Sequence, residues 1–370
     1  MKIVLATGIY PPAIGGPATY VAALAREFEG AGHEVVVVTY GVALYSAVES
    51  CKWKVNFVPK WGGPLMRWWR YARVLKREGS DADIVYAFSS VSAGIPVMLA
   101  RLKKPRKVLR LGGDFFWERY TDAGGVLGLR EWYENMKKWK VESGKWKALR
   151  LMMAIILRSF DHIVFSTFFE EGIYEHEYRL PPHSVIENAF PKGQPVPHAK
   201  HDPFRLLFMG RFVGFKNLPS LVRAVALLPG MRLTLVGSGP SEEGLRRLAS
   251  QILATDRVQF LPPFFGEEKD RLFAEQDLLV IPSITELSPN VALEARSSGL
   301  PVFLTRETGL SERLSKGMTV RDCSTPEKIA AAVRDIRDSY DAVAREAALP
   351  VPERPWEDLA REHLILFERL

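Results

Sequence analysis

The chain has 370 residues, of which 47% are hydrophobic and 25% charged, and it carries a formal net charge of +7. This length exceeds what one hydrophobic core usually organises, so we expect two domains. This composition is that of an ordinary globular protein and argues against disorder or a solenoid. The two cysteines, Cys51 and Cys323, lie far apart outside any CxxC motif. Their spacing argues against a disulfide framework or structural zinc site and favours a reducing, cytoplasmic setting.

The first half of the chain alternates short apolar runs with amphipathic stretches. Residues 3–6 predict a buried strand, a glycine loop follows, and residues 19–28 have the apolar spacing of a helix. This start reaches glycine and proline too soon for a signal peptide, and no run of about 18 apolar residues predicts a membrane span. Further buried strands are predicted at residues 35–39, 84–88, 108–111 and 162–166. Such alternation predicts a doubly wound parallel sheet.

A composition change then predicts a domain boundary. Residues 181–203 are rich in proline, histidine and lysine, which is typical of a linker. The strand–helix alternation restarts at residues 205–209 and continues through strands at 233–236, 258–261, 278–281 and 301–304. We therefore expect an α/β protein with Rossmann-like domains over residues 1–195 and 203–350, followed by a helix at 355–370.

The second half contains two glutamates, Glu286 and Glu294, with seven residues between them, followed by Gly299-Leu300-Pro301-Val302. This segment resembles the signature of family 4 glycosyltransferases of the GT-B fold. The resemblance extends over nearly the whole chain through short motifs at residues 15–16, 186–190, 209–211, 216–217 and 236–240. It implies two domains facing each other across a donor-binding cleft, with the final helix returning to the first domain. It also implies retaining transfer of a hexose-type sugar from a nucleotide diphosphate sugar, with no cofactor and no metal.

Two cations are candidates for contacting the departing diphosphate. Arg211 and Lys216 follow the strand at residues 205–209, and open α/β sheets bind ligands at the carboxyl ends of their strands. A leaving diphosphate needs cations and backbone N–H groups aimed at its oxygens. An arginine and a lysine on a loop are more often plain surface charges, but the resemblance favours a catalytic and donor-binding role for both.

The segment between the two glutamates predicts an anion site. Ser288 reads as the N-cap and Pro289 as the first residue of a helix, which leaves the N–H groups of Asn290 and Val291 available with the helix dipole behind them. Glu294 lies about one turn further on. The resemblance implies that it accepts hydrogen bonds from the ribose hydroxyls.

The resemblance implies that Glu286 faces the transferred sugar as a catalytic residue. Alternatively, both glutamates are solvated acids that a helix N-terminus favours. Leu287 departs from the family, which often has glycine at this position, and the departure affects the shape of the donor-sugar pocket.

Glycines and one aspartate complete the predicted site. Gly15 and Gly16 follow the first strand and Gly237 another strand, where a missing side chain lets the backbone approach a phosphate. They are donor-binding candidates; an ordinary turn is the alternative. Asp114 follows the strand at residues 108–111 and is the candidate for positioning the acceptor hydroxyl or binding the transferred sugar. Family members often have a histidine in this part of the cleft, and this chain has none there.

Two apparent metal motifs are interpreted differently. Asp81-Ala82-Asp83 resembles the metal-binding Asp-x-Asp of another glycosyltransferase fold, but it lies at the amino end of a strand, so a helix-to-strand turn is the better interpretation. His198 and His201 lie in the predicted linker without an acidic cluster. No metal site is predicted.

Basic residues and tryptophans concentrate in the first half. Residues 51–158 contain 23 Lys and Arg against 9 Asp and Glu. Residues 132–158 predict a basic amphipathic helix, interrupted near Ser143-Gly144, that docks on an anionic membrane; packing of its apolar side in the core is the alternative. Its apolar stripe contains Trp132, Met136, Trp139, Trp146, Leu149, Met153 and Ile156. Its basic residues are Lys137, Lys138, Lys140, Lys145, Lys147 and Arg150.

These features together predict a peripheral protein on the inner face of the cell membrane, with a lipid-linked or cell-envelope glycan as acceptor. A nucleotide-sugar epimerase or a phosphorylase of related fold is an alternative enzyme. A basic nucleic-acid-binding module is the alternative from another class, although no nucleic-acid-binding motif occurs in the basic region, so no nucleic-acid partner is expected.

Overall fold

A computed structural model describes residues 1–13, 15–41, 52–138, 144–193, 195–196, 198–252, 256–264, 266–351 and 354–370, with the backbone alone at 137–138 and 144–146. The chain forms two compact units. The first comprises Met1–Phe116, Asn135–Ala189 and Trp356–Leu370, and the second comprises Trp117–Glu134 and Phe190–Pro355.

The first unit is built on a seven-stranded parallel sheet in the order β3-β2-β1-β4-β5-β6-β7. Its central strands are runs of buried, largely β-branched residues, as expected for a sheet covered on both faces. The strands are β1 (Lys2–Thr7), β2 (Glu34–Tyr40), β3 (Lys54–Val58), β4 (Ile84–Phe88), β5 (Arg106–Leu111), β6 (His162–Phe165) and β7 (His183–Val185).

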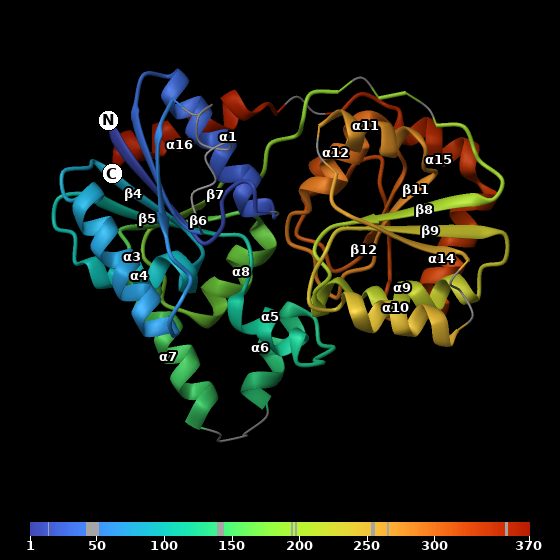
Figure 1. Cartoon of the computed structure of the whole chain (residues 1–370), viewed down its shortest axis with the longest axis horizontal. Helices are drawn as coiled ribbons and strands as arrows, with labels where there is room; N and C mark the ends of the chain where they lie inside the picture. Colours follow the sequence, from blue (N-terminus) through green and yellow to red (C-terminus); the bar gives the residue numbers. More distant parts are fainter. Residues whose placement is uncertain are drawn as a thin grey trace. The chain divides into compact units, whose positions relative to one another are not determined.

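Helices lie between these strands in the chain, and one more is at its end; residues 117–134 among them belong to the second unit. They are α1 (Gly16–Gly30), α3 (Pro64–Gly79), the π-helix η1 (Ser90–Gly94), α4 (Ile95–Ala100), α5 (Phe115–Asp122), α6 (Leu129–Lys138), α7 (Gly144–Arg158), α8 (Phe168–Glu177) and α16 (Trp356–Arg369). The final helix α16 lies beside α1 (Figure 1), where the rings of Phe28 and Phe367 are 5.9 Å apart. The buried His363 contacts the Tyr86 hydroxyl at 3.0 Å and adds a polar tie between α16 and β4.

The second unit has a six-stranded parallel sheet in the order β10-β9-β8-β11-β12-β13. Helices α9 and α10 lie on one side of this sheet, and α11 and α12 lie on the other (Figure 1). Its strands are β8 (Phe204–Met209), β9 (Met231–Val236), β10 (Val258–Leu261), β11 (Leu278–Ile281), β12 (Val302–Thr305) and β13 (Thr319–Arg321). Its helices are η2 (Gly214–Lys216), α9 (Leu218–Ala226), α10 (Glu242–Gln251), α11 (Glu267–Ala274), α12 (Asn290–Ser298), α13 (Glu312–Ser315), α14 (Pro326–Asp338) and α15 (Tyr340–Ala347).

The structure confirms two parallel Rossmann-like sheets and differs from the expected domain limits in two places. Residues 117–134 pack with the second unit, because Trp117 and Leu129 find partners there. The chain passes into the second unit at Phe190, and the expected linker contains strand β7. A short strand such as β7 can have a polar sequence, because it forms its backbone hydrogen bonds with the neighbouring strand β6.

Candidate active site

Two glycine loops define the carboxyl edge of the second sheet. Gly237 follows β9 with φ +143°, and a Cβ atom there would lie 1.9 Å from the carbonyl oxygen of Gly210, which follows β8. The N–H of Phe212 donates to the Ser238 carbonyl at 3.0 Å, so the two loops are joined by their backbones. Glycine at 237 is therefore required for close packing of these loops, in addition to any approach of a ligand.

The structure brings Lys216 and Glu286 into direct contact. Lys216 Nζ lies 2.5 Å from Glu286 Oε2, and the Ser283 hydroxyl donates to the same oxygen at 2.6 Å. The side chains of Lys216 and Glu286 are 15% and 8% exposed. The backbone of Glu286 is held as well, because its N–H donates to the Glu307 carbonyl at 2.8 Å. One carboxylate oxygen of Glu286 is thus fixed by two donors.

The segment at residues 117–134 contacts the neighbours of this pair. The N–H of Leu129 donates to Thr285 Oγ1 at 2.9 Å, directly before Glu286 in the chain. The rings of Trp117 and Phe215 lie 5.6 Å apart, directly before Lys216. These contacts hold the two loops that carry Lys216 and Glu286. The sequence analysis did not find this role, because nothing in the local pattern links the segment to the second sheet.

The same segment changes the environment of a further acid. Burial raises the pKa of Glu307, and the guanidinium of Arg130 opposes this shift. Glu307 Oε1 lies 3.4 Å from the position of a Cβ atom added at Gly128. Glu307 is therefore part of the packing between residues 117–134 and the Glu286 loop.

Helix α12 begins one residue later than predicted. Pro289 is the N-cap and Asn290 the first helical residue, so the prediction of Ser288 as N-cap and Pro289 as first residue was wrong. Proline has no N–H and its fixed φ suits the turn that enters the helix. Asn290 and Val291 lie in the first turn of the helix. The predicted anion site keeps these two residues.

Glu294 has a cationic neighbour that the sequence analysis did not find. Lys269 Nζ on α11 lies 3.3 Å from Glu294 Oε2, with the two side chains 22% and 23% exposed. Arg211 is exposed on the loop after β8 and forms no ion pair with any described residue. Leu287, the departure from the family pattern, is buried and packs inward beside Glu286.

The remaining predicted residues belong to the first unit. Gly15 is the N-cap of α1 with φ +151°, a conformation that favours glycine, and Gly16 is the first residue of that helix. Asp114 is fully buried. Its carboxylate accepts hydrogen bonds from the Tyr174 hydroxyl at 2.8 Å and from the Phe116 N–H at 2.9 Å.

A second buried carboxyl lies beside Asp114. Glu170 Oε1 accepts the N–H of Gly113 at 3.2 Å, so the Gly112-Gly113-Asp114 loop is fastened to α8. Burial, followed by the charge of Asp114, raises the pKa of Glu170 to about 8. Glu170 therefore holds a proton at neutral pH, which avoids two buried negative charges. Its place in a helix without a motif gave no signal in the sequence.

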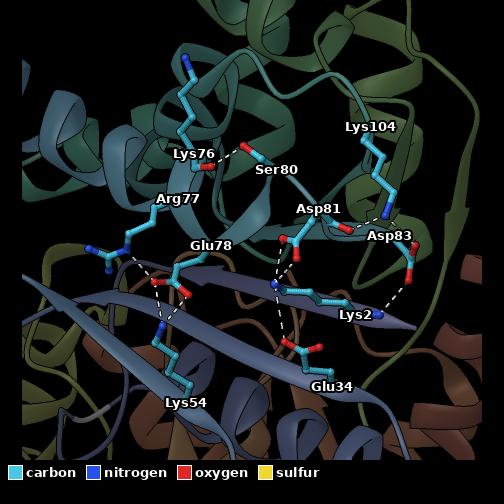
Figure 2. Close-up of polar contacts among 10 residues, drawn as sticks. All are labelled: Lys2, Glu34, Lys54, Lys76, Arg77, Glu78, Ser80, Asp81, Asp83 and Lys104. Carbon is cyan, nitrogen blue, oxygen red and sulfur yellow. Dashed lines mark hydrogen bonds and ion pairs between the residues drawn. The ribbon is translucent and has the colours of Figure 1, made fainter.

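The aspartates of the first apparent metal motif have cations as partners, and the histidines of the second contact residues directly before β11. The side chain of Lys2 lies between Asp81 and Glu34 (Figure 2). Its Nζ is 2.8 Å from Asp81 Oδ1. The backbone N–H of Lys2 donates to Asp83, which Lys104 also approaches at 3.5 Å. His201 Nδ1 lies 2.9 Å from Asp277 Oδ1, and His198 Nδ1 lies 3.2 Å from the Gln276 carbonyl. Both histidines thus tie the segment before β8 to the second sheet.

The basic segment forms two helices, of which α7 belongs to the first unit and α6 crosses from the second unit to the first after Glu134. Trp132 on α6 is buried in the second unit, and Met153 and Ile156 on α7 are buried in the first, so these residues of the stripe pack in cores. Leu151 and Ile155 on α7 are 61% and 50% exposed. Trp139, Lys140 and Ser143 lie outside the described residues, as do the side chains of Lys137, Lys138, Lys145 and Trp146.

Two parallel α/β units, one with a cation–carboxylate pair near a helix N-terminus at the carboxyl ends of its strands, define a two-domain α/β protein with a polar site at the edge of the second sheet. Residues 14–191 match the model of Glycosyltransferase Family 4, and residues 191–347 match that of Glycosyl transferases group 1. The chain belongs to the family 4 glycosyltransferases, and its fold is GT-B.

Similar proteins agree with this placement. A D-inositol 3-phosphate glycosyltransferase from Pseudarthrobacter chlorophenolicus is 40% identical over 124 residues, 31% of this chain and 30% of that protein. The match thus spans about a third of that relative's length. The sucrose-phosphate synthase of Thermosynechococcus elongatus superposes with a TM-score of 0.77 at 17% identity, covering 100% of this chain and 99% of that one. HepE of Anabaena in complex with UDP-glucose superposes with a TM-score of 0.76 at 15% identity over 100% of both chains.

Proposed function

We propose that the protein is a retaining glycosyltransferase that moves a hexose-type sugar from a nucleotide diphosphate sugar to a hydroxyl of an acceptor. The observation that carries the proposal is the Lys216–Glu286 pair on loops at the carboxyl edge of the second sheet, whose chain continues into helix α12. The structure of HepE with UDP-glucose supports a nucleotide sugar as the donor class.

The site residues of the second unit have separate roles in donor binding. Lys216 and Arg211 neutralise the charge that develops on the leaving diphosphate, and the first turn of α12 at Asn290 and Val291 supplies N–H donors to its oxygens. Glu294 accepts hydrogen bonds from the ribose hydroxyls. Lys269 fixes the orientation of that carboxylate through their 3.3 Å contact.

The chemical step needs little covalent participation from the protein. Glu286 faces the transferred sugar with one oxygen, while its other oxygen is held by Lys216 and Ser283. The donor phosphate itself helps to deprotonate the acceptor hydroxyl, so the sugar keeps its anomeric configuration. We assign no metal to this step, because Lys216 and Arg211 supply the positive charge.

In the first unit we assign acceptor binding to the loop of residues 112–114. The buried carboxylate of Asp114 has no exposed surface, so we give it a positioning role for this loop instead of direct contact with the acceptor. The hydrogen bond from the Gly113 N–H to Glu170 also holds this loop in position.

The acceptor is proposed to be lipid-linked or a cell-envelope glycan, with the first unit docked on the inner face of an anionic membrane. Helix α3 supports this proposal better than α6 and α7 do. It carries exposed Leu65 and Trp69 next to Arg67 and Arg73, a combination typical of an interfacial helix. Within the described residues no helix is long and apolar enough to cross a membrane.

A donor screen tests the proposal. Purified protein is incubated with a panel of nucleotide sugars and a membrane lipid extract, and release of nucleoside diphosphate is followed together with transfer of labelled sugar to lipid. We expect one donor to raise the thermal midpoint of the second unit and to be consumed only when lipid extract is present. Interconversion of the donor without transfer would show an epimerase, and consumption of none of the donors would contradict the proposal.

A further inference from the structure

A cavity of about 380 Å³ lies between the end of β3 and helix α3, in the first unit. Tyr40, the last residue of the neighbouring strand β2, also lies at the carboxyl edge of this parallel sheet. Open parallel sheets bind ligands at this edge. The cavity is lined by Phe57, Val58, Pro59, Arg70, Arg73, Val74 and Arg77.

Arg70, which lines the cavity, and Tyr40, which pairs with the lining residue Val58 between β2 and β3, have unused hydrogen-bonding capacity. Nε and Nη1 of Arg70 and the hydroxyl of Tyr40 are buried and have no hydrogen-bond partner among the described residues. Burial raises the pKa of Tyr40 to about 12, against the opposing effect of nearby Arg67 and Arg70, so the hydroxyl keeps its proton and can donate. Buried donors without partners cost stability, and an oxygen-rich anion would satisfy them.

The charge at this site is not neutralised by the protein. Among the described residues Arg67, Arg70 and Arg73 form no ion pair with an acid. Arg77 differs, because its Nε lies 2.8 Å from Glu78 Oε1, as Figure 2 shows. Of the three arginines that line the cavity, Arg70 and Arg73 are therefore available to an anionic ligand.

Exposed apolar side chains lie next to these arginines. Leu65, Trp69 and Arg73 follow one another at intervals of four residues on α3, so they lie on one line of the helix. Leu65 is 77% exposed, Trp69 53% and Trp61 68%. The guanidinium carbon of Arg70 lies 3.7 Å from the centre of the Trp61 ring, and that of Arg73 lies 4.7 Å from the Trp69 ring. Apolar and cationic groups thus occur side by side, as they do at membrane interfaces.

We propose that this cavity binds the phosphate group of a membrane lipid that serves as the acceptor or carries it, while Trp61, Leu65 and Trp69 enter the interface beside the phosphate. The planar guanidinium matches phosphate with paired N–H donors, which an ammonium group cannot do. The inference rests on the proposed function and specifies its acceptor class as a lipid phosphate.

The test uses short-chain phosphatidic acid below its micelle concentration, titrated into the full chain by calorimetry. We expect Arg70→Gln and Arg73→Gln each to weaken binding by about tenfold or more, since each removes a charged hydrogen-bond donor from the phosphate. Arg70→Lys keeps the charge and loses the paired donors, so it should also bind more weakly. Arg26→Gln, on an exposed position of α1, removes the same charge elsewhere and should bind like the wild type.

Three outcomes would overturn the inference. These are no binding of phosphatidic acid by wild type, equal affinities for the Arg70, Arg73 and Arg26 variants, and binding of inorganic phosphate as tight as that of the lipid. The last would assign the cavity to a free anion. Calorimetry with UDP separates this inference from the proposed function. If wild-type protein binds UDP but not the lipid, only the inference is refuted. If the protein binds the lipid but transfers sugar from no donor, the proposed function is refuted instead.

Discussion

Replacing Lys216 by methionine removes the ammonium group that contacts Glu286 at 2.5 Å and keeps a side chain of similar length. The two side chains are 15% and 8% exposed, so the pair lies between a surface pair and a buried one. Breaking a fully buried pair costs about 3–5 kcal/mol, and an exposed pair contributes about 0–1 kcal/mol. Ser283 still donates to Glu286 in the variant, so we expect a loss of about 2 kcal/mol. For a unit of this size that loss lowers the thermal midpoint by about 4–8 °C.

The loss of activity should be larger than the loss of stability accounts for. If Lys216 stabilises the departing diphosphate, turnover falls by about 10²-fold or more at temperatures where the variant is folded. The double variant Lys216→Met/Glu286→Gln should regain most of the thermal midpoint and none of the turnover. Lys328→Met, in an exposed pair with Asp322, is the control and should change neither quantity. Initial rates and thermal denaturation measure both effects. Wild-type turnover in folded Lys216→Met would refute the assignment.

Further predictions concern ribose binding by Glu294, the protonation of Glu170, the packing of residues 117–134 and independence of metal ions. Glu294→Ala should weaken nucleotide affinity by about tenfold in calorimetry, and an unchanged affinity would remove the ribose assignment. Burial raises the pKa of Glu170 to about 8, so the folded protein keeps a proton that the unfolded chain releases at lower pH. The free energy of unfolding should therefore fall as pH rises from about 5 to about 8, by up to about 1.4 kcal/mol per pH unit. Denaturant titrations of Glu170→Gln should lack this slope. Thr285→Val leaves the buried Leu129 N–H without its acceptor and should lower the free energy of unfolding by about 1–3 kcal/mol, with turnover falling more than nucleotide affinity. Transfer should survive EDTA, whereas abolition by chelation would reopen the question of Asp81 and Asp83.

The sequence was sufficient for the fold because the strands that it identified are continuous apolar runs. Residues 35–39 and 278–281 are examples, and both are buried in their sheets. Strand β3 was missed because Lys54–Val58 lies at the edge of its sheet and is mostly half-buried. An edge strand needs no run of apolar residues, so hydrophobic periodicity does not identify it.

The site was predictable where its residues follow strand ends. Lys216 was identified from its place after a strand and Glu286 from the resemblance to the family signature, but their contact depends on how two loops fold and could not be derived from spacing. Lys269 and Glu170 are single residues on helices, without any motif. They acquire their importance from neighbours that are distant in sequence, and Glu170 does so through the charge of Asp114.

The configuration of the transferred sugar tests the central claim most directly. Once the donor is identified, proton NMR of the product formed in the first turnovers reports the anomeric configuration of the new linkage, and phosphorus NMR identifies the released nucleoside diphosphate. The account predicts that the linkage keeps the donor's configuration and that one diphosphate is released per sugar transferred. An inverted linkage, or transfer without release of diphosphate, would contradict it.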